Sequence, residues 1–334
     1  MSVAGPQRGC KGATAASAGR LCATPMVGKV VIRGQRQRGA ALVVAMLIAA
    51  IAAAVATTLS VDGARWLSVV EGRRDHARAT SLATAGVQWA RQTIEEDATH
   101  GPVDHLGEPW AIALPATPVD GGTVQGRIED AQARLNVNAV AGIDAGSGVA
   151  RERLARLFER RGLDPALVDA LADWIDPDAI ARERGAEDTA YERDRGVAAN
   201  APLTRTGELA AVRGFTPATV ARVAGELAAL PADVGVNVNT ASADVLTIVL
   251  PKLDGEAIAA IVAARRERPY ATIQDFRSRA ARGTSVPDTT GLTVGSRHFL
   301  VTVVARQGDA VVRAEALVAR VDRQPPALVW QVVD

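Results

Sequence analysis

The middle of the chain holds its densest group of side chains able to do chemistry. The carboxylates belong to Asp173, Asp176, Asp178, Glu187 and Asp188, and Pro177 and Gly185 between them favour a loop. Carboxylates crowded on a loop repel one another unless a cation gathers them, and Ca²⁺ takes roughly six to eight oxygen ligands. A calcium site is therefore one interpretation of the segment, although its spacing does not match an EF-hand. The alternative is a solvated acidic loop paired with Arg182, Arg184 and Arg193.

Known catalytic motifs are absent from the sequence. The histidines are His76, His100, His105 and His298, and none has a metal-binding spacing or adjoins a Ser or Cys motif. There is no P-loop, nucleophile elbow or dinucleotide fingerprint. Asp176 and Asp178 form a carboxylate pair that could act as acid and base, but without a supporting motif we expect no enzymatic role.

A second motif lies further along the chain and resembles a helix-hairpin-helix unit. The string Val236-Asn-Val-Asn-Thr-Ala241 leads into two helical stretches joined at Leu253-Asp254-Gly255. Hairpins that bind DNA offer backbone amides to phosphate. Here the first hairpin glycine is missing, and Asp254 and Glu256 would repel DNA. We therefore expect a structural helical fold and no nucleic-acid partner; a membrane-anchored DNA-uptake protein is the alternative.

An internal echo indicates that the helical part is built from two related modules. Arg134-Leu-Asn-Val-Asn138 recurs as Gly235-Val-Asn-Val-Asn239, and helical sequence follows each copy. The asparagines of both strings are expected to hydrogen-bond to backbone and stabilise turns.

The one long apolar segment runs from Ala40 to Val61 without a charged residue. At a rise of about 1.5 Å per residue, a helix of this length spans a bilayer core of about 30 Å. Arg33, Arg36 and Arg38 precede it, which places the N-terminal side in the cytoplasm and sends the rest of the chain outward.

Three interpretations of this segment compete: a secretory signal peptide, an uncleaved signal anchor, and a type IV prepilin-like segment. The string Arg36-Gln-Arg-Gly39-Ala40 has the third form, in which cleavage after Gly39 leaves the apolar helix as the mature N-terminus. The leader is long for this class, and Met26 would start one of ordinary length. A mature N-terminus at Ala40 would separate this interpretation from a plain signal-anchored domain.

The elements around these motifs predict an α+β fold. A pilin-like long N-terminal helix packs on a small antiparallel sheet, and a large all-α domain, helix-hairpin-helix-like and SAM-like, is inserted between strands. We expect helix to about Asp97, loop from His100 to Gly122, a strand at Thr123–Glu129, and a hairpin of Arg297–Ala305 with Ala310–Val321. The expected segments are a leader at 1–39, a transmembrane helix at 40–61, pseudopilin helix and first strands at 62–135, the inserted domain at 136–290, and C-terminal strands at 291–334.

These features resemble one family of type II secretion pseudopilins, general secretion pathway protein K. Pilins and most pseudopilins carry Glu at the fifth mature position, where this chain has Val44. The K family also lacks that Glu, and its acidic region resembles the strings Trp174-Ile-Asp176 and Gly185-Ala-Glu-Asp-x-x-Tyr191. The resemblance extends from Arg38 to about Val321.

The resemblance implies a minor pseudopilin that forms the pseudopilus tip with the I and J components. It implies processing by the prepilin peptidase and N-methylation at Ala40, calcium in the helical domain, and a single-pass protein of the bacterial inner membrane with a periplasmic C-terminal domain. Export of folded proteins across the outer membrane is the function it implies.

Composition agrees with this interpretation without specifying it. The chain has 334 residues, a net charge of +1 and only 3% aromatic residues, so no basic field favours nucleic acid and small side chains must build the core. The cysteines, Cys10 and Cys22, both lie in the leader. A mature chain without cysteine suits an oxidising compartment.

Overall fold

The computed structural model describes residues 38–142, 144–192, 196–280, 288–321 and 324–334. The chain divides into two units, one ending at Ala64 and the other comprising Arg65–Asp334. The predicted leader, with Cys10, Cys22 and Met26, lies outside the described residues apart from residues 38 and 39.

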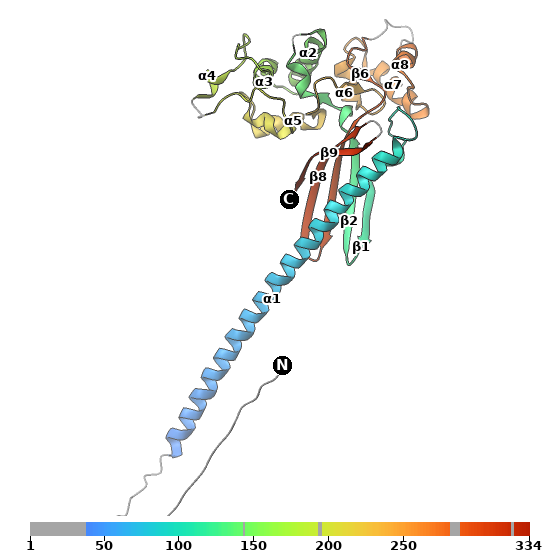
Figure 1. Ribbon diagram of the computed structural model, residues 1–334. Helices are drawn as coiled ribbons and strands as arrows, with labels where there is room; N and C mark the ends of the chain where they lie inside the picture. The colour runs from blue at the N-terminus through green and yellow to red at the C-terminus, as the bar shows by residue number, and fades with distance from the viewer. Residues whose placement is uncertain (1–37, 143, 193–195, 281–287, 322–323) are drawn as a thin grey trace, which may run out of the picture. The chain divides into compact units, whose positions relative to one another are not determined.

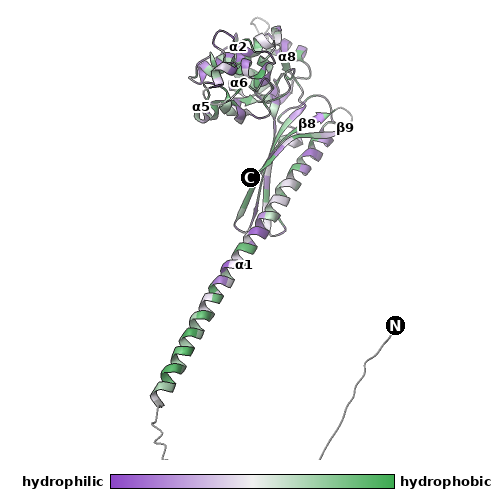
Figure 2. Ribbon diagram, turned by 60° about the vertical axis from the view of Figure 1, so that its left-hand side comes forward, coloured by the Kyte–Doolittle hydropathy of each residue, from purple (hydrophilic) through white to green (hydrophobic). Residues whose placement is uncertain are grey.

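Helix α1 (Arg38–Asp97) is one continuous helix, as predicted. Its N-terminal part is apolar, as Figure 2 shows, and its large side chains from Leu42 to Val61 are exposed. The hydroxyls of Thr57 and Thr58 donate to the carbonyls of Ala53 and Val55 within the helix. Polar groups satisfied within the helix can lie in hydrocarbon. Among the described residues this is the one helix long and apolar enough to cross a membrane.

A five-stranded antiparallel sheet lies in the unit that begins at Arg65 (Figure 1). Its order is β1-β2-β7-β8-β9. The bounds are Leu114–Val119, Gly122–Asp130, His298–Gln307, Ala310–Val321 and Gln324–Val333. The predicted hairpin is confirmed, with Gln307 opposite Ala310 across the turn. The loop predicted from His100 to Gly122 is wrong at β1, because Pro115 and Pro118 read as loop and are tolerated in an edge strand.

The C-terminal part of α1 packs on this sheet through a row of small side chains. Ala79, Ala83, Val87, Ala90 and Ile94 are buried at helical spacing. They pack against Val301, Val303, Val312, Ala314 and Ala316. A Cβ on Gly86 would lie 2.7 Å from Cγ1 of Val303, so glycine permits the close approach of helix and sheet. These contacts explain how a core low in aromatics can still be tightly packed.

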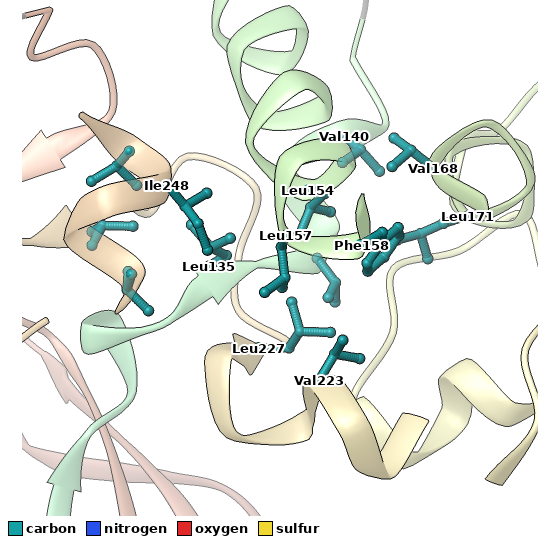
Figure 3. Close-up of a cluster of buried hydrophobic side chains, with 14 of the residues drawn as sticks. Leu135, Val140, Leu154, Leu157, Phe158, Val168, Leu171, Val223, Leu227 and Ile248 are labelled. Carbon is teal, nitrogen blue, oxygen red and sulfur yellow. The ribbon is translucent and has the colours of Figure 1, made fainter. Parts of the chain in front are cut away.

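The helical block is inserted in the chain between β2 and β7. Its helices are α2 (Ala145–Arg160), α3 (Leu167–Ile175), α4 (Asp188–Tyr191), α5 (Pro217–Val223), α6 (Ala243–Val249), α7 (Gly255–Glu267) and α8 (Ile273–Ala280). Figure 3 shows apolar side chains from several of these helices meeting around Phe158, which is fully buried. The block therefore has a hydrophobic core of its own, and the predicted α+β fold with a helical insertion is confirmed.

The sequence echo corresponds to a structural repeat. Strand β3 (Leu135–Asn136) pairs in parallel with β4 (Leu227–Ala228), and β5 (Val236–Asn237) pairs in parallel with β6 (Leu292–Thr293). The side chain of the second asparagine in each string hydrogen-bonds to both the NH and the carbonyl of a residue far along the chain. Asn138 accepts from the NH of Leu203 and donates to its carbonyl, and Asn239 does the same with Tyr270. The expected backbone role of these asparagines is confirmed.

Candidate functional site

The acidic segment follows α3, and part of it forms a compact group of carboxylates. Asp176 caps the C-terminus of α3, Asp178 follows in the loop, and Glu187 precedes α4. One carboxylate oxygen from each of these three residues lies within 4.8 Å of the others. The loop thus brings together side chains from both ends of the acidic segment.

Buried oxygens without a partner distinguish this group from a solvated loop. Oδ1 of Asp176 and both carboxylate oxygens of Glu187 are buried with no hydrogen-bond partner. Asp176 is only 2% exposed and Glu187 only 7%. Burial raises the pKa of Glu187, and the negative charges of Asp173 and Asp176 raise it further. A hard cation would satisfy these oxygens and remove the repulsion.

Asp173 and Asp188 use their oxygens to order the loop backbone. Oδ2 of Asp173 accepts from the NH of Ala186 at 2.8 Å and of Arg182 at 3.1 Å. Oδ1 of Asp188 accepts from the NH of Ala198 at 2.9 Å. A Cβ on residue 185 would collide with Oδ2 of Asp173, so only glycine fits there. These two carboxylates border the compact group and hold its loop in place.

An arginine lies against the carboxylates as well. Nη1 of Arg182 is 2.5 Å from Oδ1 of Asp173 and 2.5 Å from Oδ2 of Asp176. The solvated-loop alternative named two further arginines. Arg184 lies 3.9 Å from the exposed Asp164, which is not a member of this group, and Arg193 lies outside the described residues.

The loop is fixed against the helical core by an aromatic pair. The rings of Trp174 and Tyr191 pack edge to face with centroids 5.0 Å apart. The hydroxyl of Tyr191 accepts from the NH of Arg213 at 3.1 Å. This packing ties α4, which follows Glu187, to α3, which precedes Asp176.

In the helix-hairpin-helix motif, a side chain of the hairpin itself caps the N-terminus of the second helix. Oδ1 of Asp254 accepts from the NH of Ala257 at 2.8 Å and caps α7. The helix N-terminus that would face a phosphate therefore already carries a carboxylate. The geometry gives no support to the DNA-binding alternative.

Sequence reasoning missed a polar network at the junction of the sheet and the helical block. The buried carboxylate of Asp130, at the end of β2, accepts from Ser296, Thr240 and Asn237. Asp104 accepts from the NH of Ser296 at 2.7 Å. These groups are far apart in sequence, and only the Asn-Val-Asn string marked any of them in advance.

Protonation of Asp130 is expected to make stability depend on pH. Burial raises its pKa to about 6, although hydrogen bonds from Ser296, Thr240 and the NH of Gln132 favour the ionised form. Between about pH 4 and pH 6 the folded chain therefore holds a proton that the unfolded chain has released, and its free energy of unfolding falls as pH rises. The shift corresponds to about 3 kcal/mol.

The D130N variant removes this titration. We expect its unfolding free energy, measured by urea titration of the detergent-solubilised protein, to fall about 3 kcal/mol less than that of the wild type across the same window. D309N, at the exposed turn between β7 and β8, is the control and should follow the wild-type profile. Parallel pH profiles of the unfolding free energy for D130N and the wild type would contradict the assignment of this titration to Asp130.

Comparisons with known proteins identify the family. Two family models described as type II secretion system protein K match residues 133–232 and 236–295. A type II secretion system protein K of Pseudomonas aeruginosa is 31% identical over 303 residues, which cover 86% of this chain and 89% of that protein. This chain belongs to the type II secretion system protein K family.

Further relatives and a solved structure agree with this assignment. The protein K of Klebsiella pneumoniae is 28% identical, with 86% of this chain and 94% of that protein covered. A crystal structure of the GspK-GspI-GspJ complex from enterotoxigenic Escherichia coli matches with a TM-score of 0.68 at 21% identity, over 78% of this chain and 98% of that chain. That match shows a shared fold. As a protein K family member, the chain is a minor pseudopilin of a type II secretion system.

Proposed function

We propose that this protein K works at the tip of the pseudopilus, in a complex with the I and J minor pseudopilins of its own system. It initiates assembly there and supports export of folded proteins across the outer membrane, by binding and without bond-making chemistry. The helical block between β2 and β7 carries this proposal, because so bulky an insertion cannot be accommodated between neighbours in a filament shaft. The solved complex that shares this fold contains K, I and J proteins.

The N-terminal helix supports the proposed location. The apolar part of α1 crosses the inner membrane once, and the preceding arginines keep its N-terminal side in the cytoplasm. The region from Arg65 onward then lies in the periplasm. The prepilin peptidase cleaves after Gly39, and Ala40 becomes the methylated N-terminus. Val44, in place of the usual Glu, suits a subunit with no neighbour above it whose terminal amine needs a partner.

We further propose that the acidic group binds Ca²⁺ as a structural ion. Asp176, Asp178 and Glu187 supply the nearest oxygens, and Asp173 and Asp188 border the site and complete its negative charge. The unpartnered oxygens of Asp176 and Glu187 fit a hard cation. Bound Ca²⁺ would fix α4 relative to α3 and so stabilise the exposed edge of the helical block.

Co-purification tests the tip complex. Full-length protein expressed with the I and J components of the same genome is expected to elute with both after detergent extraction, in a single species. The exposed face of α1 from Arg65 to Glu95 is the expected contact. Elution of the K protein alone, or salt-sensitive DNA binding by it at moderate ionic strength, would contradict the proposal.

A further inference from the structure

Two groups of carboxylates in the described part of the chain have the geometry of a cation site, and each contains an arginine. One is Asp97, Asp104 and Glu108, with Arg320; the other is Asp176, Asp178 and Glu187, with Arg182. The two groups differ in how fully the arginine and neighbouring donors satisfy the carboxylate oxygens.

The carboxylates of the Arg320 group have partners without an ion. Its guanidinium lies 2.8 Å from Asp97 and 2.8 Å from Asp104 through separate nitrogens. Glu108 accepts from the NH of His105 and from the indole nitrogen of Trp110, each at 2.8 Å. None of these three described carboxylates has a buried oxygen without a partner. Arg320 therefore serves Asp97 and Asp104 in the place of a cation.

The Arg182 group remains incomplete. A single nitrogen serves two carboxylates, Asp173 and Asp176, and the rest of the negative charge is unmatched. Oδ2 of Asp176 contacts Arg182 while its Oδ1, and both oxygens of Glu187, have no partner. Asp176 is therefore shared: one oxygen faces the arginine and the other is free for an ion.

The arginine is also more exposed to solvent than the carboxylates that it contacts. Its side chain is 24% exposed, whereas those of Asp173 and Asp176 are 0% and 3% exposed. Its backbone NH is held by Oδ2 of Asp173, independently of the guanidinium. The guanidinium can thus turn toward solvent while the loop backbone stays in place. A guanidinium left within a few ångströms of Ca²⁺ would repel it strongly.

We propose that Arg182 is an internal counter-ion that competes with Ca²⁺ for Asp176. Without the ion it bridges Asp173 and Asp176, offsets part of their negative charge and preserves the loop; when Ca²⁺ binds, it releases Asp176 and turns to solvent. This inference rests on the proposed calcium site. Arg182 thereby stabilises the ion-free form and lowers the calcium affinity, so that the loop changes its charge partner without losing its fold.

The R182Q variant tests this competition, with R184Q as the matched control. Arg184 is on the same loop and its loss changes the net charge equally, but it contacts none of these carboxylates. We expect R182Q to bind Ca²⁺ at least about tenfold more tightly in calorimetric titration of the full chain, and R184Q to stay within about twofold of the wild type. In EDTA the thermal midpoint of R182Q should be lower than that of the wild type, and Ca²⁺ should raise it by more.

The possible results separate this inference from the calcium site itself. If the wild type binds Ca²⁺ and R182Q binds it equally or less tightly, the competition is overturned and the site stands. If neither binds Ca²⁺, the site and the competition both fail. An equal gain in calcium affinity in R184Q would show that the change in net charge alone explains the effect, and it would overturn the inference. If R182Q does not fold in EDTA, its recovery on refolding with Ca²⁺ supports the inference, and failure to recover overturns it.

Discussion

Replacing Glu187 by glutamine is expected to weaken calcium binding by about 1,000-fold. Both oxygens of Glu187 are buried and unpartnered. An incoming ion would therefore not have to displace a hydrogen-bond partner from this carboxylate. The amide keeps the size of the side chain but removes its charge and one acceptor oxygen. Removing one partner of a buried charge pair costs roughly 3–5 kcal/mol, which corresponds to a loss of this size.

The same substitution should stabilise the ion-free protein, because it removes a buried charge that its neighbours repel. Burial and the nearby aspartates raise the pKa of Glu187, so the ionised form costs free energy at neutral pH. In EDTA the thermal midpoint of E187Q should match or exceed that of the wild type, and added Ca²⁺ should no longer raise it. E183Q, on the exposed side of the same loop, should behave as the wild type. Wild-type calcium affinity in E187Q would exclude Glu187 from the site.

Local patterns predicted most elements of the fold, because apolar spacing and turn residues act over short distances. Helix α1, the β7–β8 hairpin and the helices after each Asn-Val-Asn string follow from such patterns. Strand β1 does not: its two prolines are tolerated only because it lies at the edge of the sheet, and edge position is a tertiary property. The insertion between β2 and β7 was predictable because strand-like sequence resumes only after the helical block.

The acidic segment shows where sequence reasoning stops. Crowding predicted that the carboxylates meet, and three of them do; it did not predict that Asp173 and Asp188 turn toward backbone amides. Such bonds depend on the path of the loop around Gly185. The network of Asp104, Asp130 and Ser296 was beyond prediction for another reason, since its members are separated by long stretches of chain and each looks like an ordinary loop or strand-end residue.

The largest expected effect is on processing, and it concerns Gly39. Substitution by leucine puts a bulky side chain at the residue before the proposed cleavage point, within a helix that already begins at Arg38. We expect wild-type protein, co-expressed with the prepilin peptidase, to start at Ala40 in nearly every molecule, and G39L to retain its leader in nearly every molecule. N-terminal sequencing and intact mass of the membrane-extracted protein measure both. G63L makes the same substitution further along α1, at a glycine with open space around it, and should be processed normally.

Retention of the leader would also block assembly, for an electrostatic reason. The uncleaved chain keeps Arg33, Arg36 and Arg38 next to the apolar run, and drawing the helix outward into a filament would carry them into hydrocarbon. Each arginine at the bilayer centre costs at least about 2.5–3.5 kcal/mol. G39L should therefore remain in the membrane fraction and fail to co-elute with the I and J components. A wild-type chain that begins at Met1 or Met26 would contradict the prepilin interpretation, and G39L cleaved after residue 39 would show that the small residue there is not required.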